Sequence, residues 1–357
     1  MIDAQAGDDT IVALGGLDII DGGAGADTIN YSSDDTSIST GIQVTLSGGN
    51  QVAVVENGTS NQIDLIKNIE NIIGTGLADT ITVDDQVNVI TAGGGADTII
   101  SIAGVNADTF DGGAGTDTLS YFGTSTAITV DLSDNVGKFS DLTRGAVTDQ
   151  IKDFENFTGS QAGDNITGSN VDNVLIGDLG NDYIDGGDGN DTINGGSGAD
   201  TLIGGDGNDS IIGGSGNDSI DGGDGNDVIS AGAGLSDYVL GSLGTDTITG
   251  GEEADDSDTI DYNQGLVGVT SITVDMNAGT VVLNGVAQTQ NVSQFEYYIG
   301  TSGGDAFDGD AEDNTFEGLD GHDTFRGGAG DDILIGGDGN DYFYATADAD
   351  YYQGGAH

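Results

Sequence analysis

A large apolar residue recurs at every ninth position between Gly177 and Ser230. Polar residues flank each apolar position, which is the alternation of a short strand with one buried face. The stretch reads as six nine-residue repeats with the pattern G-G-x-G-x-D-x-U-x, where U is the apolar residue and Asp178 replaces the second glycine of the first repeat. We expect buried side chains at position eight of these repeats: Ile184, Ile193, Leu202, Ile211, Ile220 and Ile229.

A fixed short period predicts a solenoid, in which each repeat adds one turn and one strand. Glycine at positions one, two and four permits positive φ angles, so the chain can turn tightly between strands. Two repeats make one rung of 18 residues, and stacked rungs lie about 4.8 Å apart. The position-six aspartates then form two columns, one on each edge: Asp182, Asp200 and Asp218, and Asp191, Asp209 and Asp227.

These columns create an electrostatic problem, because carboxylates one rung apart repel each other. The sequence has no Lys or Arg between Gly159 and Thr324, so a column needs counter-cations. Carboxylate and carbonyl oxygens, without cysteine or a histidine cluster, favour Ca²⁺ over a transition metal. The alternative is a disordered acidic linker, which gives no reason for an apolar residue at every ninth position.

The repeats resemble the RTX (repeats-in-toxin) nonapeptide, the haemolysin-type calcium-binding repeat of secreted bacterial proteins. The resemblance implies an all-β, right-handed parallel β-roll with several Ca²⁺ ions held between successive turns. It also implies that position-six aspartates of two stacked turns ligate each ion together with carbonyls of the glycine-rich turns. The matching aspartates are Asp27, Asp97, Asp117, Asp164, Asp172, Asp182, Asp191, Asp200, Asp209, Asp218, Asp227, Asp246, Asp323, Asp332 and Asp341. The matching carbonyls of the main block belong to Gly186, Gly187, Gly189, Gly195, Gly196, Gly198, Gly204, Gly205, Gly207, Gly213, Gly214, Gly216, Gly222, Gly223 and Gly225.

Three inserts break the nine-residue period. Each follows a tyrosine (Tyr31, Tyr121 or Tyr262) and returns to the repeats through a G-T/S-x-x-x-D turn. We expect each insert to be a pair or trio of longer strands, added to the solenoid wall or folded over it. Their apolar tails would pack against the roll: Ile66, Ile69, Ile72, Ile151, Phe154, Phe157, Phe295 and Tyr298. The predicted domains are a short β-roll block with the first insert (1–73), a second block with the second insert (74–158), the main block (159–261), the third insert (262–299) and a C-terminal block (300–357).

One repeat and most of the basic residues depart from this pattern. The repeat AGVNADTFD keeps Asp108 but loses two of the three glycines whose carbonyls an ion site would use. Most of the basic residues lie in the first two inserts, where we expect them to relieve local repulsion or pair with nearby aspartates: Lys67, Lys138, Arg144 and Lys152.

The net charge and the lack of long apolar stretches exclude several classes of partner. A net charge of −57 excludes nucleic acid as a natural partner and disfavours anionic membrane surfaces. No stretch approaches the ~20 apolar residues of a transmembrane helix, and the N-terminus lacks the features of a signal peptide. The repeats are already in register at Ala4 and break off at the last residues, so we expect the chain to be a segment of a longer protein.

The sequence shows no catalytic constellation. It contains no H-E-x-x-H motif, His322 lies at a variable turn position and His357 is terminal; we therefore expect no enzymatic activity. Threonines at position seven could form an ice-binding ladder, but Tyr183, Ser219 and other residues interrupt it. The favoured function is Ca²⁺ binding coupled to folding outside the cell, and the resemblance suggests type I secretion. The alternative is a structural or adhesive protein of a surface layer or biofilm, with an unknown surface or matrix partner.

Overall fold

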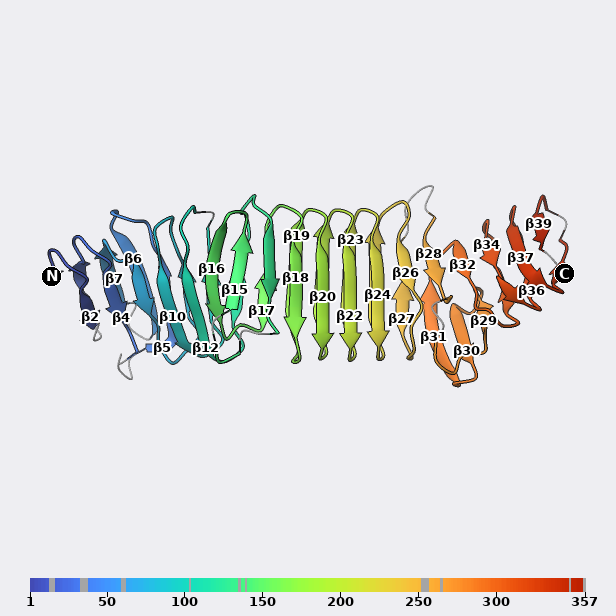
Figure 1. Ribbon diagram of the computed structural model, residues 1–357, viewed down its shortest axis with the longest axis horizontal. Coiled ribbons are helices and arrows are strands. Elements are labelled where there is room, and N and C mark those ends of the chain that lie inside the picture. Colours follow the sequence, from blue (N-terminus) through green and yellow to red (C-terminus); the bar gives the residue numbers. More distant parts are fainter. Residues whose placement is uncertain are drawn as a thin grey trace. The chain divides into compact units, whose positions relative to one another are not determined.

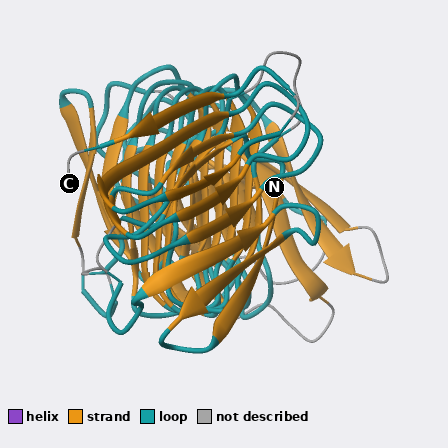
Figure 2. Cartoon of the chain, turned by 90° about the vertical axis from the view of Figure 1, so that its right-hand side faces the viewer, coloured by secondary structure: helices purple, strands orange, loops and turns teal. Residues whose placement is uncertain are grey.

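The computed structural model describes residues 1–12, 17–32, 38–58, 62–102, 104–133, 136–138, 140–251, 257–263, 266–346 and 348–355. Every regular element in these ranges is a β-strand (Figure 2), so they contain no helix that could cross a membrane. The chain forms two compact units, Met1–Leu179 (unit 1) and Gly180–His357 (unit 2). The prediction of an all-β fold is confirmed, whereas the five-block division stays a prediction.

In unit 1 the strands form two walls of a parallel β-solenoid. In the order of their pairing, wall A contains β1 (Ile2–Asp3), β3 (Ile19–Asp21), β7 (Gln62–Lys67), β6 (Val52–Gly58), β5 (Ile38–Thr45), β9 (Thr80–Thr82), β11 (Thr98–Ile100), β13 (Thr118–Ser120), β17 (Asn156–Thr158) and β19 (Val174–Leu179). Wall B contains β2 (Thr10–Val12), β4 (Thr28–Asn30), β8 (Asn71–Ile73), β10 (Val89–Gly94), β12 (Thr109–Ala114), β16 (Val147–Lys152), β15 (Ser140–Arg144), β14 (Ile128–Asp131) and β18 (Asn165–Ser169).

Unit 2 has the same two-walled architecture. One wall contains β21 (Thr192–Ser197), β23 (Ser210–Ser215), β25 (Val228–Ala233), β27 (Thr247–Thr249), β31 (Gln288–Ser293), β30 (Thr280–Asn284), β29 (Ser271–Asp275), β33 (Ala306–Asp308), β36 (Thr324–Arg326) and β38 (Tyr342–Tyr344). The other contains β20 (Tyr183–Asp188), β22 (Thr201–Asp206), β24 (Ser219–Asp224), β26 (Tyr238–Leu240), β28 (Thr259–Asp261), β32 (Tyr297–Ile299), β34 (Thr315–Glu317), β37 (Ile333–Gly339) and β39 (Tyr351–Gly354), and β35 (Asp320–Gly321) pairs separately with β37.

The register of unit 2 confirms the 18-residue rung. Ile184 pairs with Leu202, and Leu202 pairs with Ile220. Figure 1 shows their strands β20, β22 and β24 as successive rungs. The six position-eight side chains between Ile184 and Ile229 are at most 1% exposed, and burying each contributes roughly 1.5–3 kcal/mol to the free energy of unfolding. This apolar stripe holds the two walls together.

Each insert is a three-stranded antiparallel meander that is spliced into one parallel wall. In unit 1 the first insert runs β5–β6–β7 in wall A, and the second runs β14–β15–β16 in wall B. In unit 2 the third insert runs β29–β30–β31. The last strand of each meander pairs in parallel with the preceding rung, and the first strand pairs in parallel with the following rung. Of the two arrangements expected, the trio of strands within the wall is therefore the one adopted.

The apolar tails of the inserts become ordinary core positions. Ile66, Phe157 and Tyr298 are at most 2% exposed and occupy the same register as position-eight residues. In the C-terminal part of unit 2 this position is aromatic in most rungs, and Leu334 is an aliphatic exception. The rings of Phe307 and Phe325 stack at a centroid distance of 5.1 Å, a favourable offset geometry for aromatic pairs.

Candidate metal sites

The position-six aspartates in the first rungs of unit 2 form two columns. On one edge the N–H of Asp182 donates to Oδ1 of Asp200 at 2.8 Å, and the N–H of Asp200 donates to Oδ1 of Asp218 at 2.9 Å. The opposite edge repeats this chain of hydrogen bonds through Asp191, Asp209, Asp227 and Asp246. The predicted stacking of these residues is therefore confirmed.

The same contact joins most of the other predicted aspartates. In unit 1, Oδ1 of Asp27, Asp97 and Asp117 accepts from the N–H of the position-six residue one rung earlier. In unit 2, Oδ1 of Asp323, Asp332 and Asp341 does so at 2.8, 3.0 and 3.1 Å. One carboxylate oxygen is thus used to hold successive rungs together.

The second oxygen of most of these carboxylates is buried. Among the described residues, Oδ2 of Asp200, Asp218 and Asp227 has no hydrogen-bond donor. No described residue donates a hydrogen bond to the buried Oδ2 of five further aspartates: Asp27, Asp97, Asp117, Asp323 and Asp332. Burying a charged oxygen without a partner costs several kcal/mol, so these atoms mark the points where a cation would stabilise the fold.

Glycine at position one lets this oxygen approach the next rung. A Cβ atom on Gly195 would lie 2.5 Å from Oδ2 of Asp200 and 2.7 Å from the carbonyl oxygen of Gly213. A carboxylate oxygen and a carbonyl oxygen therefore converge on space that a side chain would fill. Both are hard oxygen ligands of the kind that Ca²⁺ prefers, so the residues present fit that ion.

The glycines at positions two and four bring further carbonyls between the rungs. Gly205 and Gly207 have φ angles of +112° and +143°, and a Cβ on either would lie within 2 Å of the carbonyl oxygen of Gly187 or Gly189 one rung earlier. Only glycine tolerates both the dihedral angle and the contact. The predicted carbonyls at these positions thus lie close to the following turn of the same edge.

Burial makes four of the column carboxylates hard to ionise. Desolvation, followed by repulsion from Asp200 and Asp237, raises the pKa of Asp218 to about 7. Desolvation likewise raises the pKa of Asp97, Asp227 and Asp323 to about 7. A nearby cation favours the ionised form and would reverse this shift. Within the described ranges no three Asp, Glu, His or Cys side chains form a metal cluster, so an ion here would need carbonyl ligands as well.

A hydroxyl at position two changes the site. The N–H of Ser160 donates to Oδ2 of Asp164 at 2.6 Å, and its Oγ donates to Oδ1 at 2.9 Å. Thr75 and Thr301 make the same pair of contacts to Asp79 and Asp305. These are the G-T/S-x-x-x-D turns that follow the inserts. In them a backbone N–H donates to the aspartate Oδ2, the atom that has no donor in the glycine turns of Asp200 and Asp218.

One predicted ligand is misplaced. Asp172 is exposed, whereas Asn173 is buried and accepts from the N–H of Ser169 at 2.7 Å. The register explains the error, because Leu175 pairs with Phe157 at position eight and this sets position six at residue 173. Asn173 therefore replaces Asp172 in the column, and its amide carries no charge for a cation.

Sequence analysis missed several acidic members of the columns. Glu70, Glu155 and Glu296 accept from the N–H of Asp27, Asp117 and Asp258, at 2.8, 2.8 and 2.9 Å. Each glutamate stands two residues before a buried apolar position, so position six also accommodates Glu, a signal that a search for Asp alone overlooks. Asp237 and Asp258 extend the column beyond Asp218 and were missed because the spacing there is 19 and 21 residues.

The tyrosine that opens each insert reaches the column of its edge. The hydroxyl of Tyr121 donates to Oδ2 of Asp149 at 2.6 Å, and the hydroxyl of Tyr262 donates to Oε1 of Gln290 at 2.6 Å. The hydroxyl of Tyr31 donates to Oδ2 of Asp64 at 3.4 Å. These acceptors occupy position six of the last strand of each insert, so the inserts continue the columns with partners of their own.

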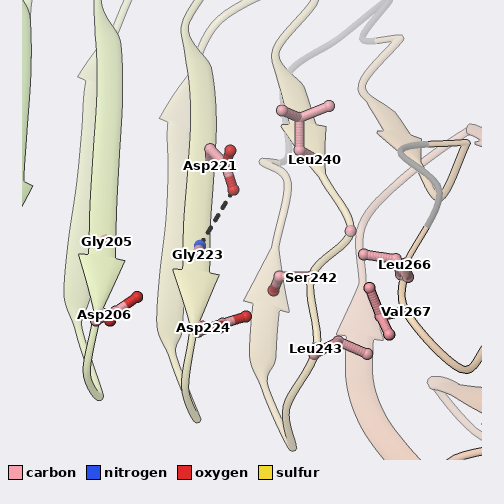
Figure 3. Close-up of a pocket in the computed structure, with 11 residues that line it drawn as sticks. Gly205, Asp206, Asp221, Gly223, Asp224, Leu240, Ser242, Leu243, Leu266 and Val267 are labelled. Atoms are coloured by element: carbon pink, nitrogen blue, oxygen red, sulfur yellow. Dashed lines mark hydrogen bonds between the residues drawn. The ribbon is translucent and has the colours of Figure 1, made fainter.

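A groove of about 440 Å³ lies on unit 2, bordered by the exposed carboxylates of Asp206 and Asp224 and by aliphatic side chains. Figure 3 shows Leu240, Leu243, Leu266 and Val267 on its apolar side. Its described lining contains no His, Lys or Arg. Its titratable side chains are all aspartates, so the groove offers no pair of residues suited to act as general acid and general base. The expectation that the chain is not an enzyme stays a prediction.

The two walls and the stacked turn carboxylates define a parallel β-roll. A family model described as RTX calcium-binding nonapeptide repeat (4 copies) matches residues 2–38, 73–101, 102–120, 159–202, 203–235, 235–265, 299–334 and 326–356. These matches cover more than half of the chain, and the protein therefore belongs to the RTX calcium-binding nonapeptide repeat family. The unmatched segments coincide with the three inserts. No curated protein matches the chain.

Proposed function

We propose that this protein is a Ca²⁺-binding β-roll that folds when it binds the ion outside the cell, as a segment of a larger secreted protein. The observation that carries the proposal is the buried Oδ2 of Asp200 and Asp218, which has no donor among the described residues and faces carbonyls of the next rung. One ion would lie between the turns of Asp182 and Asp200, and the next on that edge between Asp200 and Asp218. The second edge would repeat this at Asp191, Asp209 and Asp227.

The mechanism is linkage between binding and folding. The unfolded chain does not stack its turns, so Ca²⁺ binds the folded form far better and its binding energy becomes folding energy. Extracellular calcium modules have dissociation constants of about 10⁻⁴–10⁻³ M. Such sites would stay empty at cytosolic calcium levels, which would keep the chain exportable, and would fill after secretion.

Far-UV circular dichroism during a calcium titration tests the proposal. The titration would run from chelator to about 10 mM Ca²⁺, which exceeds the expected dissociation constants, with Mg²⁺ in a parallel series. We expect a cooperative gain of β signal with Ca²⁺ and not with Mg²⁺, because Mg²⁺ demands a smaller octahedral site and sheds water reluctantly. A chain that is fully folded in chelator and unchanged by Ca²⁺ would refute the coupling.

A further inference from the structure

The charged end of Arg144 lies inside unit 1, on the edge that carries Asp108. Arg144 ends β15, the middle strand of the second insert, and is 3% exposed. Its Nη2 lies 3.2 Å from Oδ2 of Asp149 and 3.9 Å from Oδ2 of Asp108. The two aspartates stack on one edge, since the N–H of Asp108 donates to Oδ1 of Asp149 at 2.9 Å. The guanidinium thus contacts position-six carboxylates of two successive rungs.

The same guanidinium binds carbonyls of the turn. Its Nη1 donates to the carbonyl oxygen of Gly104, and its Nη2 donates to that of Asn106 at 3.2 Å. Gly104 and Asn106 are positions two and four of the repeat whose position six is Asp108. Arg144 therefore gathers two turn carbonyls and two stacked carboxylates, which are the kinds of oxygen that Ca²⁺ would gather at the glycine-rich rungs.

The surroundings of the Arg144 guanidinium suit a side chain that keeps a permanent positive charge. The ring of Tyr121 lies 5.7 Å from the guanidinium carbon, and its hydroxyl donates to Asp149. Arginine keeps its charge when buried and presents several donors in a fixed plane. Among the described residues, Asp108 and Asp149 have no buried oxygen without a donor, in contrast to Asp200 and Asp218.

We propose that Arg144 is a built-in cation that replaces Ca²⁺ at the rung of Asp108 and Asp149. This inference rests on the proposed function, because it assumes that the other rungs bind Ca²⁺. The rung would then form without the ion and provide a calcium-independent template within unit 1. The missing glycines of the repeat AGVNADTFD agree with this, because a guanidinium that brings its own donors requires a different turn from a bare ion.

The test counts bound calcium in the whole chain by equilibrium dialysis and elemental analysis, for the wild type, Arg144→Ala and Lys138→Ala. Lys138 lies in the same insert, is exposed and carries the same charge, so its variant controls for the loss of a cation. We expect Arg144→Ala to bind one additional ion and to need a higher calcium concentration to fold, whereas Lys138→Ala behaves as the wild type. A folded Arg144→Ala with an unchanged count would overturn the inference.

Hydrogen exchange of the wild type in chelator decides the case if Arg144→Ala does not fold. We expect amides of β12 and β16 to remain more protected than amides of β22 and β24, because their rung carries its own cation. Equal exchange in the two pairs of strands would overturn the inference. A wild type that binds no calcium at all would instead refute the proposed function, and the two failures are therefore distinguishable.

Discussion

The N–H of Asp200 donates to Oδ1 of Asp218, one rung further along the solenoid, at 2.9 Å. This bond fixes the spacing of the two carboxylates. It also points Oδ2 of Asp218 toward the buried interior, where no described residue donates a hydrogen bond to it. The contact that stacks the rungs therefore also creates the demand for a cation.

Asp200→Ala should weaken calcium-induced folding. The change removes a carboxylate that would be shared by two ions, and we expect the calcium concentration at the folding midpoint to rise about tenfold, equivalent to ~1.4 kcal/mol. The measurement is the circular dichroism titration. Asp172→Ala removes an exposed carboxylate and should leave the midpoint within about twofold. Equal shifts for both variants would contradict the assignment of the columns.

Gly195→Ala should greatly reduce the stabilisation of the fold by calcium. Its Cβ would lie 2.5 Å from Oδ2 of Asp200 and 2.7 Å from the carbonyl oxygen of Gly213, so the two oxygens must separate. A Cβ on Gly76 meets nothing within 4 Å, and we expect Gly76→Ala to change the free energy of unfolding by less than about 0.5 kcal/mol. Both variants would be compared by thermal unfolding at saturating calcium. Indistinguishable midpoints would mean that this edge tolerates a side chain.

Ser160→Ala should destabilise the fold by the same amount at two calcium concentrations, one just above the folding midpoint and one saturating. Its hydroxyl donates to Oδ1 of Asp164 at 2.9 Å, and losing such a bond to a charged group costs about 1.5–3 kcal/mol. Denaturant unfolding at two calcium concentrations measures the difference. A loss that disappears at saturating calcium would show that the ion also serves this turn.

Acidification should favour the calcium-free folded form. The pKa of Asp218 and Asp227 is raised to about 7 in the folded state by desolvation, against about 4 in an unfolded chain. The folded form then binds more protons, so this contribution to stability is full below about pH 4 and is lost as the pH rises through about 7. Calcium-free samples should show more β signal near pH 5 than near pH 8. The opposite trend would refute the burial of these carboxylates.

Gln290→Glu should make a third-insert rung depend on calcium. The Nε2 of Gln290 donates to the carbonyl oxygen of Ser242 at 2.9 Å and also to Oδ2 of Asp246. A glutamate there places a second carboxylate against Asp246, and a buried unpaired charge costs about 3–5 kcal/mol. We expect a higher calcium midpoint, with Gln161→Glu at an exposed site as the control. An unchanged midpoint would show that Gln290 is replaceable.

Sequence reasoning reached the columns because their determinants are local. The dihedral freedom of Gly205 and the apolar side chain of Leu202 act within one repeat, and the period then dictates that Asp200 stacks on Asp218. It failed at Asp172 because the repeat there is degenerate, and only the pairing of Leu175 with Phe157 sets the register. It also overlooked Glu70 and Glu155, which reach position six from inside segments without the nine-residue period.

The sequence by itself determined the solenoid, its 18-residue rung and the two lines of carboxylates, because a short exact period leaves the chain few ways to bury its apolar stripe. Only the tertiary structure decided which carboxylates need an ion. Ser160, Gln290 and Arg144 satisfy their columns through contacts that depend on how a turn folds or how an insert threads into a wall. Arg144 is 36 residues from Asp108 in sequence, and the meander of the second insert brings the two together.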